Sequence, residues 1–296
     1  MPENASPPAT LAVRRDRVPL GIVYMVGATV VFAVTTAITK WQVATYPIGE
    51  VIWVRSVVAL IVCAALILPQ TGLGVFRTAR LGDHIKRGFS QSLSQTFILV
   101  ALSLMPLAGA IAINFSAPLF ATLLSVLWLR EPVSRQRWTA LAVGFLGVLI
   151  VTNPGVNTFQ IGAAFALANA VLYGTVTVAV RRMAQSESPQ TLTMYQMVVI
   201  SCFTALLLPF GFEMPTRFDA GLMVASGVGN ALGQFWWTKA LHLAPTSAVT
   251  PFSYLSLVWA MILGFIIWGD VPTIGLLIGS VIVVGSGIFL LWHETR

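Results

Sequence analysis

Long apolar stretches, separated by short polar or proline-containing breaks, follow one another along the chain from residue 18 to its end. Crossing the roughly 30 Å hydrocarbon core of a bilayer takes about 20 mostly apolar residues in a helix. The pattern contains ten such stretches, at residues 18–39, 47–68, 86–105, 107–129, 136–153, 160–180, 190–210, 219–241, 247–268 and 272–292. We therefore expect an all-α integral membrane protein with ten transmembrane helices.

The shortest of these breaks is Met105-Pro106-Leu107, where two apolar stretches adjoin with almost no loop. One unbroken helix through both stretches would be far too long for a bilayer. The pattern therefore predicts a helical hairpin at this proline.

The first 17 residues differ from the rest because they are rich in proline, alanine, charged and small polar residues. Such a composition predicts a disordered tail at residues 1–17. The first apolar stretch, after Arg14, Arg15 and Arg17, is a full-length span without a small-residue cleavage site. We therefore expect it to be retained as a transmembrane helix and not removed as a signal peptide.

The hydrophobic pattern of the first half of the chain recurs in the second half, at an offset of 139 residues. The residues that recur at this spacing include Gln95 and Gln234, Leu104 and Leu243, Pro106 and Pro245, and the acidic pair Glu131 and Asp270. This predicts two five-span repeats, residues 18–153 and 154–296. Because five is an odd number, the repeats enter the membrane in opposite orientations, and inverted repeats of this kind enclose a central substrate site and support alternating access.

Composition and charge agree with this reading and fix an orientation. The chain is 57% hydrophobic and 9% charged, whereas soluble domains have about 25% charged residues. With the amino terminus in the cytoplasm, 14 of the 17 Lys and Arg residues lie on the cytoplasmic side and two on the other, so the positive-inside rule predicts both termini in the cytoplasm. The net charge of +7 is then a topology signal, and we expect the bilayer and no nucleic acid as partner.

The segment "PLFATLLSVLWLREPVS", Pro118–Ser134, and the paired "WGDVPT", Trp268–Thr273, resemble the ends of the fourth span in each half of drug/metabolite transporters of the EamA type. The resemblance covers nearly the whole chain and is greatest to YddG-type exporters of aromatic and other amino acids. It implies a bacterial inner-membrane protein that exports small solutes, with aromatic or neutral amino acids as the leading substrates and other metabolites or drugs as the alternative. The chain departs from the family pattern in having Leu257 opposite Pro118 and an aspartate at position 270.

Polar and aromatic residues deep in the spans are the candidates for substrate binding. Amides are the sharpest signal, because lipid cannot satisfy their donors and acceptors, so each faces either a ligand or a neighbouring helix. Asn230, Gln234 and Trp237 follow at i, i+4 and i+7 along one helix face, although Trp237 is also placed as an interfacial residue would be. The predicted substrate-binding residues are Gln95, Asn114, Tyr173, Asn230, Gln234, Trp237, Ser253 and Tyr254; further polar residues within spans include Ser94 and Asn169.

A second group consists of the charged residues Lys40, Glu50 and Arg55 near the predicted outer side. Arg55 lies about 12 Å along a helix from Pro47, at 1.5 Å per residue. One interpretation is an anchor in the outer leaflet with an ion pair to Glu50. The other is a cation that draws a substrate carboxylate through an outward opening.

The sequence contains no evident machinery for energy coupling or catalysis. Apart from Glu50 near the end of one span and Asp219 at the first position of another, no acidic residue lies within a predicted span, and no nucleotide-binding G-x-x-x-x-G-K-[ST] loop is present. Because proton-driven pumps generally use buried titratable groups, we expect facilitated transport, with no metal and no cofactor. An intramembrane enzyme would need a reactive constellation such as H-E-x-x-H, which is absent; a non-transporting scaffold or receptor would not require polar groups in both halves.

Overall fold

A computed structural model describes residues 18–129, 135–152, 157–183, 186–244 and 250–294. The predicted tail at residues 1–17 and the acidic Glu131 lie outside these residues. The described part is all α-helical, and its elements are α1 (Val18–Val43), α2 (Ile48–Thr71), η1 (Gly72–Phe76), α3 (Leu81–Leu104), α4 (Leu107–Asn114), α5 (Ala117–Leu129), α6 (Arg135–Thr152), α7 (Asn157–Met183), α8 (Pro189–Ala205), η2 (Leu208–Phe210), α9 (Arg217–Leu243), η3 (Thr250–Tyr254), α11 (Leu255–Trp268) and α12 (Ile274–Glu294).

Each of the ten predicted spans coincides with helical structure, so the predicted fold class is confirmed. The fourth span is divided into α4 and α5, and the described part of the ninth consists of the short 3-10 helix η3 followed by α11. Five segments of the described chain are long and apolar enough to cross a membrane on that criterion alone: Val18–Val43, Ile48–Phe76, Leu107–Leu124, Ile161–Val180 and Pro189–Phe210. The helices α3 and α9 are not among them, and both carry several amide and hydroxyl side chains.

The predicted hairpin at Pro106 is also confirmed. Helix α3 ends at Leu104, the backbone of Met105 is extended, and α4 begins at Leu107. Proline suits this position because it lacks the amide hydrogen that the first turn of a helix leaves unpaired.

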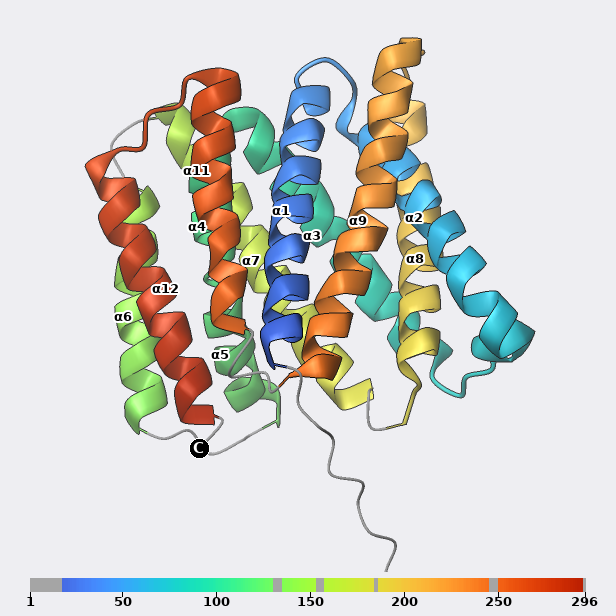
Figure 1. The fold of residues 1–296 in the computed structure, drawn as a ribbon, viewed down its shortest axis with the longest axis horizontal. Coiled ribbons are helices and arrows are strands. Elements are labelled where there is room, and N and C mark those ends of the chain that lie inside the picture. The colour runs from blue at the N-terminus through green and yellow to red at the C-terminus, as the bar shows by residue number, and fades with distance from the viewer. Residues whose placement is uncertain (1–17, 130–134, 153–156, 184–185, 245–249, 295–296) are drawn as a thin grey trace, which may run out of the picture.

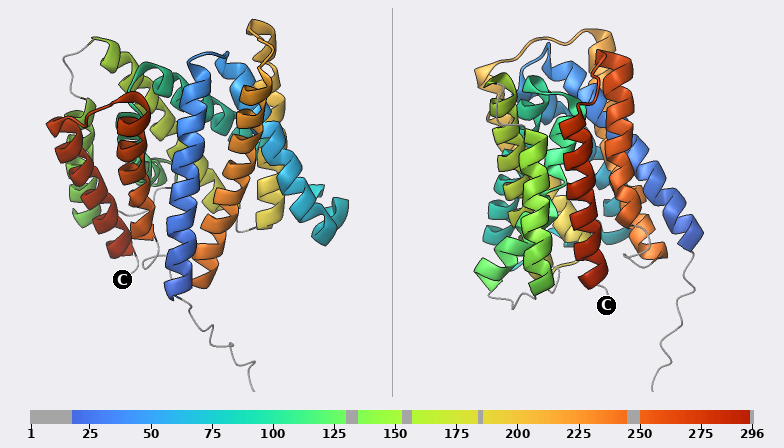
Figure 2. Two further views of the ribbon diagram at one scale, coloured as in Figure 1. Left: turned by 45° about the horizontal axis from the view of Figure 1, so that its top comes forward. Right: turned by 90° about the vertical axis from the view of Figure 1, so that its left-hand side faces the viewer.

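Helices of the first half of the chain pack mainly on helices of the second half. Helix α1 packs along α9, and its repeat equivalent α7 packs along α3; α2 packs on α8, and α6 on α12. Figure 2 shows the pair α6 and α12 at one side of the bundle and the pair α2 and α8 at the other. Every one of these pairings joins the first half to the second, as expected for two five-helix halves related by a twofold axis.

Glycine permits the closest of these contacts. On α9, an added Cβ at Gly229 would lie 2.4 Å from Thr35 of α1, and one at Gly233 would lie 2.7 Å from Phe32. Small residues four apart let helix backbones approach closely in membranes. The face of α9 that carries these glycines is therefore the face packed on α1. Asn230 follows Gly229 and Gln234 follows Gly233, so both amides are rotated by about 100° from that face.

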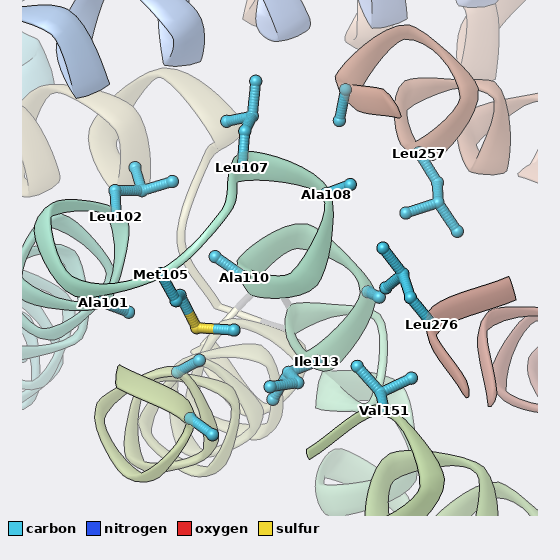
Figure 3. Close-up of a cluster of buried hydrophobic side chains, with 14 of the residues drawn as sticks. Ala101, Leu102, Met105, Leu107, Ala108, Ala110, Ile113, Val151, Leu257 and Leu276 are labelled. Carbon is cyan, nitrogen blue, oxygen red and sulfur yellow. The ribbon is translucent and has the colours of Figure 1, made fainter. Parts of the chain in front are cut away.

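The largest apolar cluster surrounds α4 at the end of the bundle opposite Val18 and Glu294, which we call the distal end (Figures 1 and 3). Leu107 and Ile113 of α4 are fully buried there, and Leu102 of α3 and Leu257 of α11 are buried beside them. In Figure 3, Leu102 and Leu257 lie on either side of α4, which carries Leu107 and Ile113. Burial of apolar side chains and close packing therefore hold the distal end together.

The end that holds Val18 and Glu294, the terminal end, is packed differently. At the distal end α1 contacts α3, and α4 contacts α11. The repeat equivalents of these contacts are α7 with α9, and η3 with α5; neither pair is among the packed pairs of the described chain. The two ends are thus unequal, with a closed distal end and a looser terminal end.

Candidate functional site

A chain of three polar side chains crosses the interior of the bundle and joins three helices. Ser94 Oγ of α3 donates a hydrogen bond to Asn169 Oδ1 of α7 over 2.7 Å, and Asn169 Nδ2 donates to Asn114 Oδ1 of α4 over 2.7 Å. Ser94 and Asn169 are 1% and 3% exposed. We call these three residues the amide network; it is uncharged and offers both donors and acceptors.

The amide network lies next to a break in the fourth span. Asn114 is the last residue of α4, and α5 begins at Ala117. At the break, the Ser116 hydroxyl donates a hydrogen bond to the backbone carbonyl of Ile113 over 2.6 Å. Broken helices in membrane transporters are tolerated where they line a cavity or are buried in protein.

The second half has its own break at the equivalent position. Phe115, in the first break, corresponds to Tyr254, where η3 passes into α11. The two rings contact each other with centroids 4.9 Å apart and planes inclined by 48°. The helix breaks of the two halves thus meet through a pair of aromatic rings, of which Tyr254 is 7% exposed.

Gln95, the residue after Ser94, holds an arginine of α2. Arg55 Nη2 donates to Gln95 Oε1 over 2.5 Å, and the arginine is half-buried. Glu50, which is fully buried, accepts from the backbone amide of Glu213 over 2.9 Å. The ion pair between Glu50 and Arg55, one of the two interpretations from sequence, is not formed.

The predicted stripe on α9 is separate from the amide network. Asn230 is half-buried and Gln234 is exposed, and within the described structure neither side-chain amide has a hydrogen-bond partner. Trp237 is half-buried with its ring 6.3 Å from that of Phe32 on α1. This contact is with the neighbouring helix and so supports a packing role for the indole.

The other predicted residues vary in placement. Tyr173 is 46% exposed on α7, one turn from Asn169, while Ser253 is 6% exposed and precedes Tyr254. An apolar groove along α6 and α12, lined by residues such as Val143, Leu146 and Ile282, contains no amide or charged side chain. This groove does not have the lining expected of a site for a polar solute.

Lys40 belongs to a contact that closes the distal end. Its Nζ atom donates to the Met105 carbonyl over 2.7 Å, lies 4.0 Å from Asp270 Oδ2 and sits 5.0 Å from the ring centroid of Trp268. Gly269, with a left-handed φ of +70°, ends α11 and turns the chain so that Asp270 reaches this position. We call Lys40, Met105, Trp268 and Asp270 the distal latch.

Two residues of the amide network, Ser94 and Asn169, were recognised from sequence as polar residues within spans but not assigned to the site. Their signal was the one used for Asn114, a polar side chain where lipid cannot satisfy it. The structure brings Asn114, Asn169 and Ser94 together and places Gln95 beside them, whereas Asn230, Gln234 and Trp237 lie on α9, which packs along α1.

Two successive segments, which together make up most of the chain, match the same family. Residues 19–153 and residues 160–292 each match the EamA-like transporter family. The chain belongs to this family. As an EamA-like transporter it is an integral membrane protein that carries small metabolites, and it is not an enzyme.

Individual relatives of this EamA-like transporter carry different solutes. It is 30% identical over 284 residues to a riboflavin transporter of Vibrio cholerae, a match that covers 93% of this chain and 94% of the relative. It is 27% identical to an S-adenosylmethionine uptake transporter of Rickettsia bellii, covering 76% and 77% of the two chains. It is also 27% identical to the pseudopaline exporter CntI of Pseudomonas aeruginosa, covering 93% and 97%.

A solved structure supports the fold. A crystal structure with 20% sequence identity superposes with a TM-score of 0.64 and covers 93% of this chain and 99% of its own. The relatives therefore support a metabolite transporter, the broader alternative from sequence, and do not support the narrower expectation of amino-acid export.

Proposed function

We propose that this transporter carries a flat heteroaromatic metabolite of the riboflavin type. The observation that carries the proposal is the amide network of Ser94, Asn114 and Asn169 beside the Phe115–Tyr254 ring pair. Amide side chains donate and accept hydrogen bonds, and aromatic rings stack on planar ligands. A flavin ring presents both a hydrogen-bonding edge and an aromatic face.

The same site is less suited to a free amino acid. A zwitterion brings one ammonium and one carboxylate group, and burying either without a partner of opposite charge is costly. Ser94, Asn114 and Asn169 carry no charge, so they offer no counter-charge to an ammonium group. The 30% identity to a riboflavin transporter over nearly the full length supports a flavin in place of an amino acid.

The proposed transport cycle is alternating access between residues 18–153 and 154–296. The helix pairings across the halves support an exchange of shapes between inverted repeats. With both termini in the cytoplasm of a bacterium, the looser terminal end would face the cytoplasm and the distal latch would face outward. The positive-inside rule supports this orientation.

We propose that transport is facilitated and driven by the gradient of the solute itself. Glu50 engages the backbone of Glu213, and Asp270 belongs to the distal latch. Neither acid is hydrogen-bonded to the amide network, where a proton would have to be exchanged with the solute. The direction of net transport is then export from a loaded cytoplasm.

The proposal is tested with full-length protein reconstituted into liposomes. Vesicles loaded with riboflavin are diluted into flavin-free buffer, and the efflux is followed by flavin fluorescence with and without protein. We expect protein-dependent efflux of riboflavin, whereas vesicles loaded with tryptophan or S-adenosylmethionine at equal concentration should show little protein-dependent efflux. Efflux of tryptophan at the same rate, or no efflux of riboflavin, would contradict the flavin proposal.

The energy coupling is tested in the same vesicles. With equal riboflavin on both sides, an imposed pH gradient should cause no net movement if transport is facilitated. Accumulation of riboflavin against its own gradient under a pH gradient alone would show proton coupling and overturn this part of the proposal.

A further inference from the structure

Arg55 is a charged residue well inside a membrane-spanning helix. It follows Ile48, the first residue of α2, by seven positions, which is about 10 Å along the helix axis. The side chain is half-buried, so part of it reaches accessible space inside or beside the bundle. Ionisable residues at such depth face a polar cavity or a partner and mark functional sites by default.

No acidic residue of the described chain neutralises this guanidinium. The ion pairs among the described residues are Lys40 with Asp270 and His84 with Glu187. Glu50 precedes Arg55 by five positions, so the two point about 140° apart around α2 at 100° per residue. The carboxylate of Glu50 accepts from the Glu213 amide instead.

Gln95 orients the guanidinium and leaves most of its donors free. A guanidinium has five N–H donors, and one of its nitrogen atoms donates to Gln95 Oε1. Gln95 is neutral, so it holds the arginine in place without cancelling its charge. An oriented guanidinium with free donors matches the geometry of a carboxylate or phosphate group.

The position of Arg55 links it to the amide network. Gln95 and Ser94 are consecutive on α3; the first turns to Arg55 of α2 and the second to Asn169 of α7. On the other side, Gly227 of α9 lies so close to α2 that an added Cβ would be 3.0 Å from the Arg55 carbonyl. Arg55 thus lies where α2, α3 and α9 come together, at the edge of the candidate site.

We propose that Arg55, oriented by Gln95, binds an anionic group of the transported solute, either a carboxylate or a phosphate. The inference rests on the proposed flavin site and adds a second contact to it. The solute would place its ring at the amide network and its anionic group at Arg55, and a cationic analogue would be disfavoured. Gln95 acts as a positioning residue because it reaches the solute through Arg55.

Riboflavin and riboflavin 5′-phosphate test this inference because they share one ring system and differ in a phosphate. Equilibrium binding of each to the purified full-length protein is measured by the change in flavin fluorescence at constant ionic strength. Charge-assisted, bidentate hydrogen bonds are about twice as strong as neutral ones. We expect the wild-type protein to bind the phosphorylated flavin about tenfold more tightly than riboflavin.

The variants separate charge from geometry. Arg55→Gln should bring the ratio of the two affinities close to one while riboflavin binding persists. Arg55→Lys should keep part of the preference, because lysine retains the charge but lacks the planar fork. Gln95→Leu should lower the ratio by less than Arg55→Gln, since the charge remains but is no longer held.

Arg77→Gln is the matched control, because Arg77 is exposed in the turn that follows η1. This variant should keep the wild-type ratio. Equal affinities in the wild type, or a preference unchanged in Arg55→Gln, would overturn the anion site and leave the flavin proposal standing. If the wild-type protein neither binds the two flavins nor transports them in liposomes, both the anion site and the flavin proposal are overturned.

Discussion

Asn169 is the residue on which the amide network depends, because it accepts from Ser94 and donates to Asn114. Its side chain is almost completely buried, so its removal would leave the amide oxygen of Asn114 without its partner and Ser94 with only a 3.4 Å hydrogen bond to the Asn169 carbonyl. Leaving a buried donor or acceptor unsatisfied costs about 1–3 kcal/mol for each group. The network is therefore sensitive to this position above the other two.

We predict that Asn169→Leu lowers riboflavin efflux from proteoliposomes at least tenfold. The leucine has nearly the same size but can neither donate nor accept, so the solute loses its hydrogen-bonding partner and the site loses its organisation. The measurement is the initial rate of fluorescence change at equal amounts of reconstituted protein. Gln70→Leu is the control, since the Gln70 amide is exposed and bonds only its own helix; a rate unchanged in Asn169→Leu would show that the network is structural.

At this scale the sequence predicts which residues are polar and deep but not which of them meet. Asn114 was identified because an amide within a span needs a partner, yet that rule names no partner. Its bond to Asn169 depends on α4 and α7 lying side by side, a property of the assembled bundle. Arg55 illustrates the same limit, because its depth follows from the sequence while its rotation toward Gln95 follows from the packing of α2 on α3.

At the scale of elements, the distal latch joins the ends of α1, α3 and α11. Lys40 of α1 contacts the carbonyl at the end of α3 and the carboxylate after α11, so one side chain ties three helices. Partly exposed ion pairs contribute roughly 0–1 kcal/mol, and a hydrogen bond about 1 kcal/mol more. The latch is therefore strong enough to bias the closed state and weak enough to open.

We predict that Lys40→Met opens the distal end more often. The probe is Ala37→Cys, a position that is 3% exposed within the distal apolar cluster, in a background with Cys63 and Cys202 replaced. A loss of about 1 kcal/mol corresponds to roughly fivefold faster labelling by a thiol reagent. Combining Lys40→Asp with Asp270→Lys should slow the labelling relative to Lys40→Asp alone; equal labelling in these two proteins would show that the ion pair does not contribute.

The helices themselves were largely predictable from sequence, whereas their interruptions were not. The length of a transmembrane helix is set by the thickness of the hydrocarbon core, which is a local criterion that a run of apolar residues satisfies. The break between Asn114 and Ala117 falls within a predicted span, and polar residues such as Asn114 and Ser116 do not mark it, because the unbroken helix α3 carries similar residues. Pro118 was the available signal, because it lacks a backbone donor just after the break.

At the scale of the whole molecule, the two ends of the bundle differ although the two halves are alike. The distal end has the contacts of α1 with α3 and of α4 with α11, and the corresponding pairs at the terminal end are not packed in the described chain. Inverted repeats change between open and closed ends by exchanging such contacts. The structure therefore corresponds to a state closed at the distal end.

We predict that Gln234→Cys, an exposed position on α9, is labelled from the side on which the termini lie. In a background without Cys63 and Cys202, a membrane-impermeant thiol reagent should label it faster in inside-out vesicles than in right-side-out vesicles. Faster labelling in right-side-out vesicles would contradict either the state or the orientation.

The contact between Phe115 and Tyr254 joins equivalent positions of the two halves, so it lies on the twofold axis that relates them. A contact on the axis is carried onto itself when the halves exchange shapes. In the alternating-access cycle proposed above, contacts away from the axis would be exchanged for their counterparts, whereas these two rings would stay together throughout. The two halves would then move about this ring contact, and a solute stacked on the rings would contact the same aromatic surface in the outward-facing and inward-facing states.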